Sequence, residues 1–302
     1  MKSVLVHSIY FLAFAVFSLF LQSCGGGSSS EQASGASEEF AAAKEEIASD
    51  ISAYIKDLPP PSEVPFLLMA TGSDFNGALV NDLDNADRYT ASIDKAALNL
   101  GVYATDIGYL SSYDQSDDVF SAVEICQRLA ETIGVASAID IDLITRFEEN
   151  IGQRDSMAVL IDEVMEVTGE RLQTLDRINL AAVALAGSFV EGLYISTQVI
   201  DTYPDDLLPE ASRNLILEPL VKIVIDQQKT LDDLLKVMGE VESNETIESM
   251  TAELNKLKAI YDNDLSEVGD KIANNTGDYQ LTKDLIAGLT QETARIRSAV
   301  IQ

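Results

Sequence analysis

Residues 178–200 read INLAAVALAGSFVEGLYISTQVI, a strongly apolar stretch whose main polar side chains are Asn179, Glu191 and Gln198. Its length is close to the roughly 20 residues that a helix needs to cross a bilayer. Glu191 lies near its centre, however, and a carboxylate at that depth in lipid would be costly. We therefore predict a helix buried in the core of the protein, and not a transmembrane helix.

The chain from residue 37 onward predicts further helices on both sides of this stretch. Apolar residues recur at helical spacing, and no run alternates with period two for long enough to indicate a strand. The fold class we predict is all-α, a multi-helix array or bundle. The predicted helices span about 38–58, 83–113, 116–133, 139–151, 155–175, 177–201, 245–264 and 278–301. Between residues 201 and 245, two further helical stretches are predicted to meet at Pro219, and the second runs to residue 238.

Residues 93–112 resemble residues 178–197 at an offset of 85, without gaps. The six identical pairs are Ile93/Ile178, Ala96/Ala181, Ala97/Ala182, Leu100/Leu185, Tyr109/Tyr194 and Ser111/Ser196. Two Ala-rich helices can agree by composition alone. A true duplication would instead give two related helical units of about 85 residues, packed into one body as in repeat proteins.

The N-terminus has the features of an export signal. Lys2 precedes an apolar run from Val4 to Leu21, and Leu21-Gln22-Ser23-Cys24 follows it. This arrangement resembles the signal of bacterial lipoproteins, in which the cysteine is acylated and becomes the first mature residue. The resemblance implies a signal peptide over 1–23, lipidation of Cys24 with palmitate among the acyl chains, and attachment to a membrane. An uncleaved N-terminal anchor is the alternative.

The residues after Cys24 predict a tether and a destination. Residues 24–37 are rich in Gly and Ser, which is typical of a flexible linker, and residues 38–302 would then form a single helical domain. Gly25, and not Asp, follows Cys24. By resemblance to enteric lipoproteins this favours the outer membrane over the inner membrane of the cell envelope.

Two short segments resemble an uncharacterised family of all-helical envelope lipoproteins of Gram-negative bacteria. They are Gly101-Val102-Tyr103-Ala104-Thr105-Asp106 and Val190-Glu191-Gly192-Leu193-Tyr194. The resemblance would cover residues 90–300, and it implies no activity.

Composition excludes several classes of function. The chain has 50 acidic and 20 basic residues and a net charge of −30, so nucleic acid is not an expected partner. Its single His, His7, lies in the predicted signal peptide, and a zinc site is therefore not expected. Cys126 would have no disulfide partner once Cys24 is lipidated, and its apolar neighbours predict a buried core residue. We expect no cofactor and no metal.

The two similar helices share an acid followed three residues later by a tyrosine. Asp106 with Tyr109 and Glu191 with Tyr194 each share a helix face, and Tyr103 lies near the same face as Asp106. The candidate ligand-binding residues are therefore Tyr103, Asp106, Tyr109, Glu191 and Tyr194. A structural role, in which each buried acid is paired between helices, is the alternative.

No catalytic motif accompanies these acids, so we predict no catalytic residues and a protein that is not an enzyme. The expected function is that of a lipid-anchored binding or scaffolding module with an envelope protein as its partner. A small-ligand-binding lipoprotein with a pocket around Asp106 and Glu191 is the alternative. A hydrolase that uses the two carboxylates is a distant third.

Overall fold

A computed structural model of the chain describes residues 42, 44–51, 53–54, 74–136, 141–150, 177–274 and 281–302, together with several positions between 153 and 172. The predicted signal peptide, Cys24 and the tether lie outside the described residues. The chain divides into two compact units, residues 1–46 and 47–302. In the first unit, the described residues 42 and 44–46 are helical. The helices described below belong to the second unit.

The all-α prediction is confirmed. Of the described residues, 84% are helical and none lies in a strand. The helices are α4 (Ala86–Tyr89), α5 (Ile93–Ser112), α6 (Ser116–Thr132), α7 (Ile141–Asn150), α9 (Ile178–Asp201), α10 (Glu210–Glu240), α11 (Glu245–Ile260), α12 (Ser266–Asn274) and α13 (Ala287–Val300). Short helical turns η1 (Gly77–Leu79), η2 (Leu83–Asn85), η4 (Tyr261–Leu265) and η5 (Lys283–Ile286) connect some of them. The described positions between 156 and 172 are also helical.

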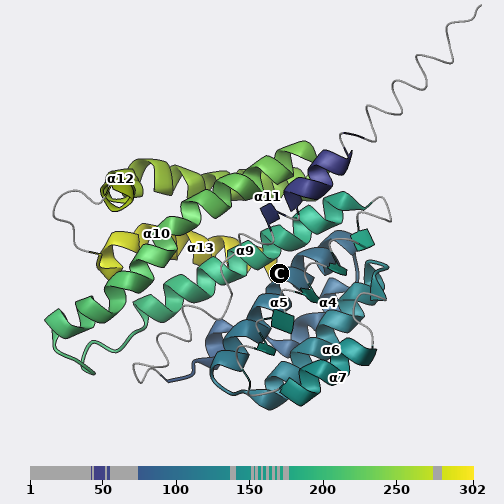
Figure 1. Cartoon of the computed structure of the whole chain (residues 1–302), viewed down its shortest axis with the longest axis horizontal. Coiled ribbons are helices and arrows are strands. Elements are labelled where there is room, and N and C mark those ends of the chain that lie inside the picture. The colour runs from purple at the N-terminus through teal and green to yellow at the C-terminus, as the bar shows by residue number, and fades with distance from the viewer. Residues whose placement is uncertain are drawn as a thin grey trace, which may run out of the picture. The chain divides into compact units, whose positions relative to one another are not determined.

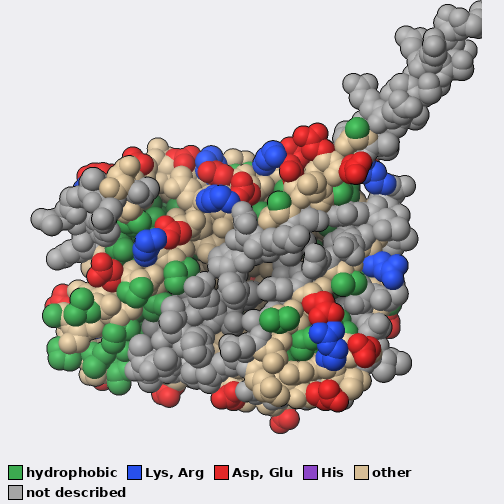
Figure 2. Space-filling model, in the orientation of Figure 1, with side chains coloured by type: hydrophobic (Ala, Val, Ile, Leu, Met, Phe, Trp, Pro, Cys, Tyr) green, Lys and Arg blue, Asp and Glu red, His purple; other side chains and the backbone are tan. Residues whose placement is uncertain are grey.

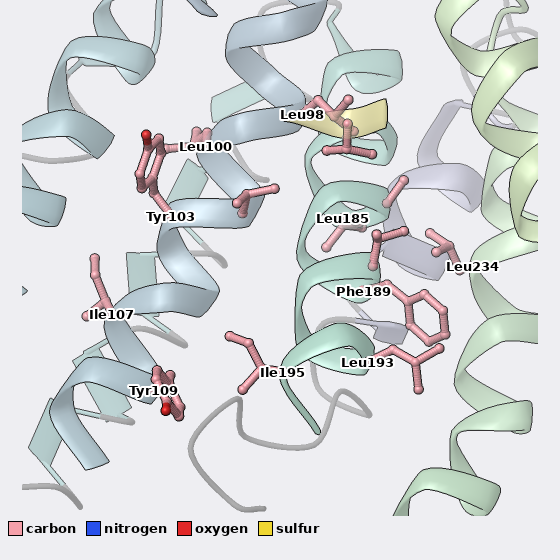
Figure 3. Close-up of a cluster of buried hydrophobic side chains, with 14 of the residues drawn as sticks. Leu98, Leu100, Tyr103, Ile107, Tyr109, Leu185, Phe189, Leu193, Ile195 and Leu234 are labelled. Carbon is pink, nitrogen blue, oxygen red and sulfur yellow. The ribbon is translucent and has the colours of Figure 1, made fainter. Parts of the chain in front are cut away.

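Helix α9 is the core helix that the sequence predicted. It packs against α5, α10, α11 and α13 (Figure 1). Phe189 and Leu193 on one side of α9 face Leu234 of α10, while α5 runs along its other side (Figure 3). Among the helices that the structure describes, α9 is long and apolar enough to cross a membrane, but 72% of its most apolar window is buried inside the protein. Its apolar surface is therefore already covered by other helices.

Helices α5 and α9 approach each other backbone to backbone. A Cβ on Gly101 would collide with the carbonyl oxygen of Ala184, and a Cβ on Gly187 would collide with that of Leu98. Just past this crossing, the hydroxyls of Thr105 and Ser188 lie 2.9 Å apart and share a hydrogen bond. The small residues are thus required by the crossing, because any side chain there would push the two helices apart.

The predicted helix over 83–113 is wrong in one respect, because the chain turns at Thr90–Ser92. Ser92 is the N-cap of α5, and its Oγ accepts a hydrogen bond of 3.3 Å from the Lys95 backbone N–H. A serine that caps the helix in this way competes with helix continuation. As a result, Ile93 begins a new helix and remains 47% exposed instead of joining the apolar face.

Pro219 does not divide two helical stretches, because α10 runs through it as one helix. Proline removes one backbone hydrogen bond and usually bends or breaks a helix. Leu217 and Leu220, on either side of it, are each 1% exposed, so core packing holds both halves in line. Beyond the end of α11 the chain also continues further than predicted, through η4 into α12.

Candidate functional site

Three helices bring three charged side chains together in the interior of the protein. Asp106 lies on α5, Glu191 on α9 and Arg297 on α13, with exposed fractions of 1%, 0% and 7%. The positions of Asp106 and Glu191 follow from the α5–α9 crossing, since both acids lie at or just beyond it. Ionised side chains this deeply buried must be compensated by neighbouring groups.

Arg297 compensates Glu191 with a two-pronged ion pair. Its Nε donates to Oε2 of Glu191 and its Nη2 donates to Oε1, both at 3.0 Å. Nη2 also donates a hydrogen bond of 3.3 Å to the carbonyl oxygen of Leu79. The guanidinium also lies over the ring of Tyr194, 4.6 Å from its centroid. This is the planar, bidentate geometry for which arginine is suited.

Asp106 is only partly satisfied in this cluster. Its Oδ2 accepts a hydrogen bond of 3.0 Å from the backbone N–H of Asn81, whereas its buried Oδ1 has no hydrogen-bond donor. Burial raises the pKa of Asp106 well above its usual value, and the charge of Glu191 raises it further. Burial also raises the pKa of Glu191, but Arg297 opposes that effect.

The charges of Glu191 and Arg297 balance each other, so the cluster is neutral when Asp106 holds a proton. A proton on Oδ1 of Asp106 gives that atom a donor role toward Glu191. Glu191 can then remain ionised against Arg297. This arrangement satisfies the orphaned oxygen and leaves no net charge in the core.

Tyr103 and Tyr109 hold a segment of chain over the acid cluster. The hydroxyl of Tyr103 donates to the Asp82 carbonyl at 2.8 Å, and the hydroxyl of Tyr109 accepts from the Asn76 N–H at 3.0 Å. Residues 76–82, which we call the cover segment, are thereby fixed to α5. Because Asn81 in this segment also donates to Asp106, the tyrosines act on the acid pair indirectly, by positioning its cover.

The structure therefore assembles part of the predicted site. Asp106, Glu191 and Tyr194 meet around Arg297, whereas Tyr103 and Tyr109 bind the cover segment. Arg297, Asn81 and the Leu79 carbonyl also belong to the cluster and were not among the predicted site residues. Arg297 could have been found, because it is a lone cation on the apolar face of α13, whose other buried members include Leu289, Ile296 and Val300.

Two clefts that are lined by described residues do not reach the acid cluster. One cleft, of about 400 Å³, lies between the cover segment and α6 and includes Phe75, Asp82 and Asp118. The other, of about 300 Å³, lies between α5, α11 and α13. Neither is lined by Asp106 or Glu191. Both carboxyls are buried, and each has at least one hydrogen-bond partner inside the protein, which fits a structural polar network.

Metal binding and thiol chemistry are two further candidates in the described part of the chain. No three His, Cys, Asp or Glu side chains there converge on a point where a metal ion could bind. Cys126 is 4% exposed, as predicted for a core residue, and burial raises the pKa of its thiol. A thiol in that state is protonated and a poor nucleophile.

Comparisons with models of known protein families, with curated proteins and with solved structures give no significant match.

Proposed function

We propose that this protein is a lipid-anchored component of the cell envelope that acts as a binding or scaffolding module and has no catalytic activity. The observation that carries the proposal is the N-terminal sequence, where Leu21-Gln22-Ser23-Cys24 ends an apolar run and a Gly/Ser-rich tether follows. The internal pairing of the acid cluster supports the absence of catalysis, because a catalytic acid or base must reach a substrate. The proposed partner is a protein of the envelope.

Metabolic labelling with a palmitate analogue tests the anchor. We expect label on the wild-type chain and none on the Cys24→Ala variant, which would also leave the outer-membrane fraction. Cys126→Ala is the matched control, since it removes the other cysteine and should leave the labelling unchanged. Label that persists in Cys24→Ala, or is lost in Cys126→Ala, would contradict the proposal.

Small-ligand binding is the second candidate, and one observation favours it. The cleft of about 400 Å³ is lined by Asn81, whose backbone N–H donates to Asp106. Its volume lies within the range of ligand pockets. A screen by thermal shift tests this candidate: a genuine ligand of the cleft should lose its effect in Asp118→Asn but not in Glu124→Gln, which removes a charge elsewhere on α6.

A further inference from the structure

An exposed apolar surface lies where α9 turns into α10. Leu207 and Leu215 are 45% and 72% exposed, the latter the most exposed large apolar residue among those described. Figure 2 shows hydrophobic side chains gathered at this end of the α9–α10 pair. We call this surface the hairpin tip; its apolar members are Pro204, Leu207, Leu208, Pro209, Ala211, Leu215 and Ile216.

The first turns of α10 place part of this surface on one side of a helix. Ala211, Leu215 and Pro219 are spaced four residues apart, so they lie along one face, and all three are exposed. The opposite face holds Leu217 and Leu220 in the core. The exposed stripe therefore adds nothing to the packing of the helix, and it leaves Leu215 in contact with water.

The rim of the hairpin tip is acidic. Asp201, Asp206, Glu210 and Glu218 are exposed and have no ion pair with any described residue. The nearby cations, Arg213 and Lys283, both pair with Asp205, at 3.2 Å and 2.8 Å. Exposed apolar side chains and acids without an ion pair are therefore interspersed along residues 201–218.

This charge pattern discriminates between possible occupants. A second copy would bring its own acidic rim and a net charge of −30 against the first. An anionic membrane surface would also be repelled. A polypeptide with an apolar strip bordered by Lys and Arg would instead match both properties of the surface. Its apolar strip would contact the exposed leucines, and its basic residues would pair with the acids at the rim.

We propose that the hairpin tip is the docking surface for the protein partner, and that the partner presents an apolar strip flanked by basic residues. This inference rests on the proposed binding function and assigns it a place on the molecule. It is independent of the acid cluster, because none of the tip residues belongs to that cluster.

The test uses the full chain held in phosphatidylcholine nanodiscs and a labelled amphipathic helical peptide of Leu and Lys, with empty nanodiscs subtracted. Binding is followed by fluorescence anisotropy at physiological salt. Leu207→Ser combined with Leu215→Ser should weaken binding at least about tenfold, since each lost leucine removes buried apolar area. Val159→Ser is the matched control, because Val159 is 62% exposed elsewhere on the surface.

A second pair of variants tests the rim. Asp206→Asn with Glu210→Gln should weaken binding about threefold and reduce its salt dependence. Asp117→Asn with Glu124→Gln removes the same charge from the exposed side of α6 and should have no such effect. A peptide of Leu and Glu should not bind.

Three results would overturn the inference. The first is equal binding by the Leu207→Ser/Leu215→Ser and Val159→Ser proteins, and the second is equal binding of the Leu/Glu peptide. The third is self-association in sedimentation, or insertion into neutral vesicles, that the leucine substitutions abolish. Because palmitate labelling does not involve the tip, failure of the tip and failure of the lipid anchor are distinguishable.

Discussion

At the residue scale, the Asp106–Glu191–Arg297 cluster combines one bidentate ion pair with one carboxyl whose pKa burial raises well above its usual value. The two roles differ because Arg297 bonds both oxygens of Glu191, while Asp106 receives only the backbone N–H of Asn81. Asp106 and Glu191 lie at matching positions of two similar helices, but only the carboxylate of Glu191 is paired with a cation.

Asp106→Asn should stabilise the protein at neutral pH. The amide can accept from the Asn81 N–H and donate to Glu191 without a proton taken from solution, so we expect a gain of about 1–3 kcal/mol in the free energy of unfolding. A raised pKa in the folded state gives stability that is complete below the unfolded value, near 3.9, and is lost as pH rises through the folded value. In denaturant titrations, the difference in the free energy of unfolding between the variant and the wild type should therefore be small at pH 4 and grow toward pH 9.

Asp106→Glu serves as the comparison, because it keeps the titrating carboxyl and should not flatten the pH dependence. A variant-minus-wild-type difference for Asp106→Asn that is the same at every pH would show that Asp106 is already ionised in the folded protein.

Arg297→Gln should destabilise the protein by about 3–5 kcal/mol, because it leaves a buried carboxylate without its cation. Arg295→Gln, on the same helix, is the matched control. Arg295 has a side chain that is 45% exposed and pairs with Glu292 and Glu253 at the surface, so its loss should cost less than about 1 kcal/mol. Equal costs in urea unfolding would contradict the buried role of Arg297.

At the element scale, the α5–α9 crossing decides where Asp106 and Glu191 of the acid cluster lie. The two helices that resemble each other in sequence pack side by side and run in the same direction (Figure 3). Gly101 lies against Ala184, and Gly187 lies against Leu98. These two contacts become equivalent when Gly101 is matched to Gly187 and Leu98 to Ala184, an offset of 86. The sequence similarity has an offset of 85, so contact symmetry and sequence similarity differ by one residue. Duplication of the two helices stays a prediction.

Gly101→Ala should be among the most damaging single substitutions in the protein. The added methyl group collides with backbone, which cannot rotate away, so we expect a loss of at least about 3 kcal/mol. Gly239→Ala in α10 is the matched control, because no atom lies within 4 Å of a Cβ there. It should stabilise the helix by up to about 1 kcal/mol. Thermal unfolding of both variants measures the contrast, and similar midpoints would mean that α5 and α9 are further apart than described.

At the scale of the whole molecule, excess negative charge governs the response to salt. The chain carries a net charge of −30, and most of the ion pairs found between described residues involve exposed side chains that contribute little. Repulsion among the unpaired acids should therefore exceed attraction within the pairs.

Added sodium chloride should raise the unfolding midpoint of the protein. Salt shortens the screening length from about 30 Å at 0.01 M to about 8 Å at 0.15 M, which weakens the repulsion between distant acids. Arg297→Gln should show the same salt response as wild type, since its pair is buried and poorly screened. A midpoint that falls with salt would mean that surface ion pairs dominate.

The sequence by itself determined the all-α class, α9 as a core helix, the burial of Cys126, and Asp106, Glu191 and Tyr194 as members of one polar group. These features depend on the periodicity and composition of single segments, which local rules describe well. The lipid anchor at Cys24 and the envelope location also come from sequence, and they stay predictions.

Only the tertiary structure decided what those residues do. Arg297 lies 106 positions from Glu191 along the chain, and the cover segment meets α5 through Tyr103 and Tyr109. Pairings of this kind depend on how helices cross, and the crossing depends on backbone contact at Gly101 and Gly187. Continuity of α10 through Pro219 was likewise set by packing, because burial of Leu217 and Leu220 outweighs one lost hydrogen bond. Local pattern fixes which segments are helical, whereas long-range packing fixes which charges become neighbours.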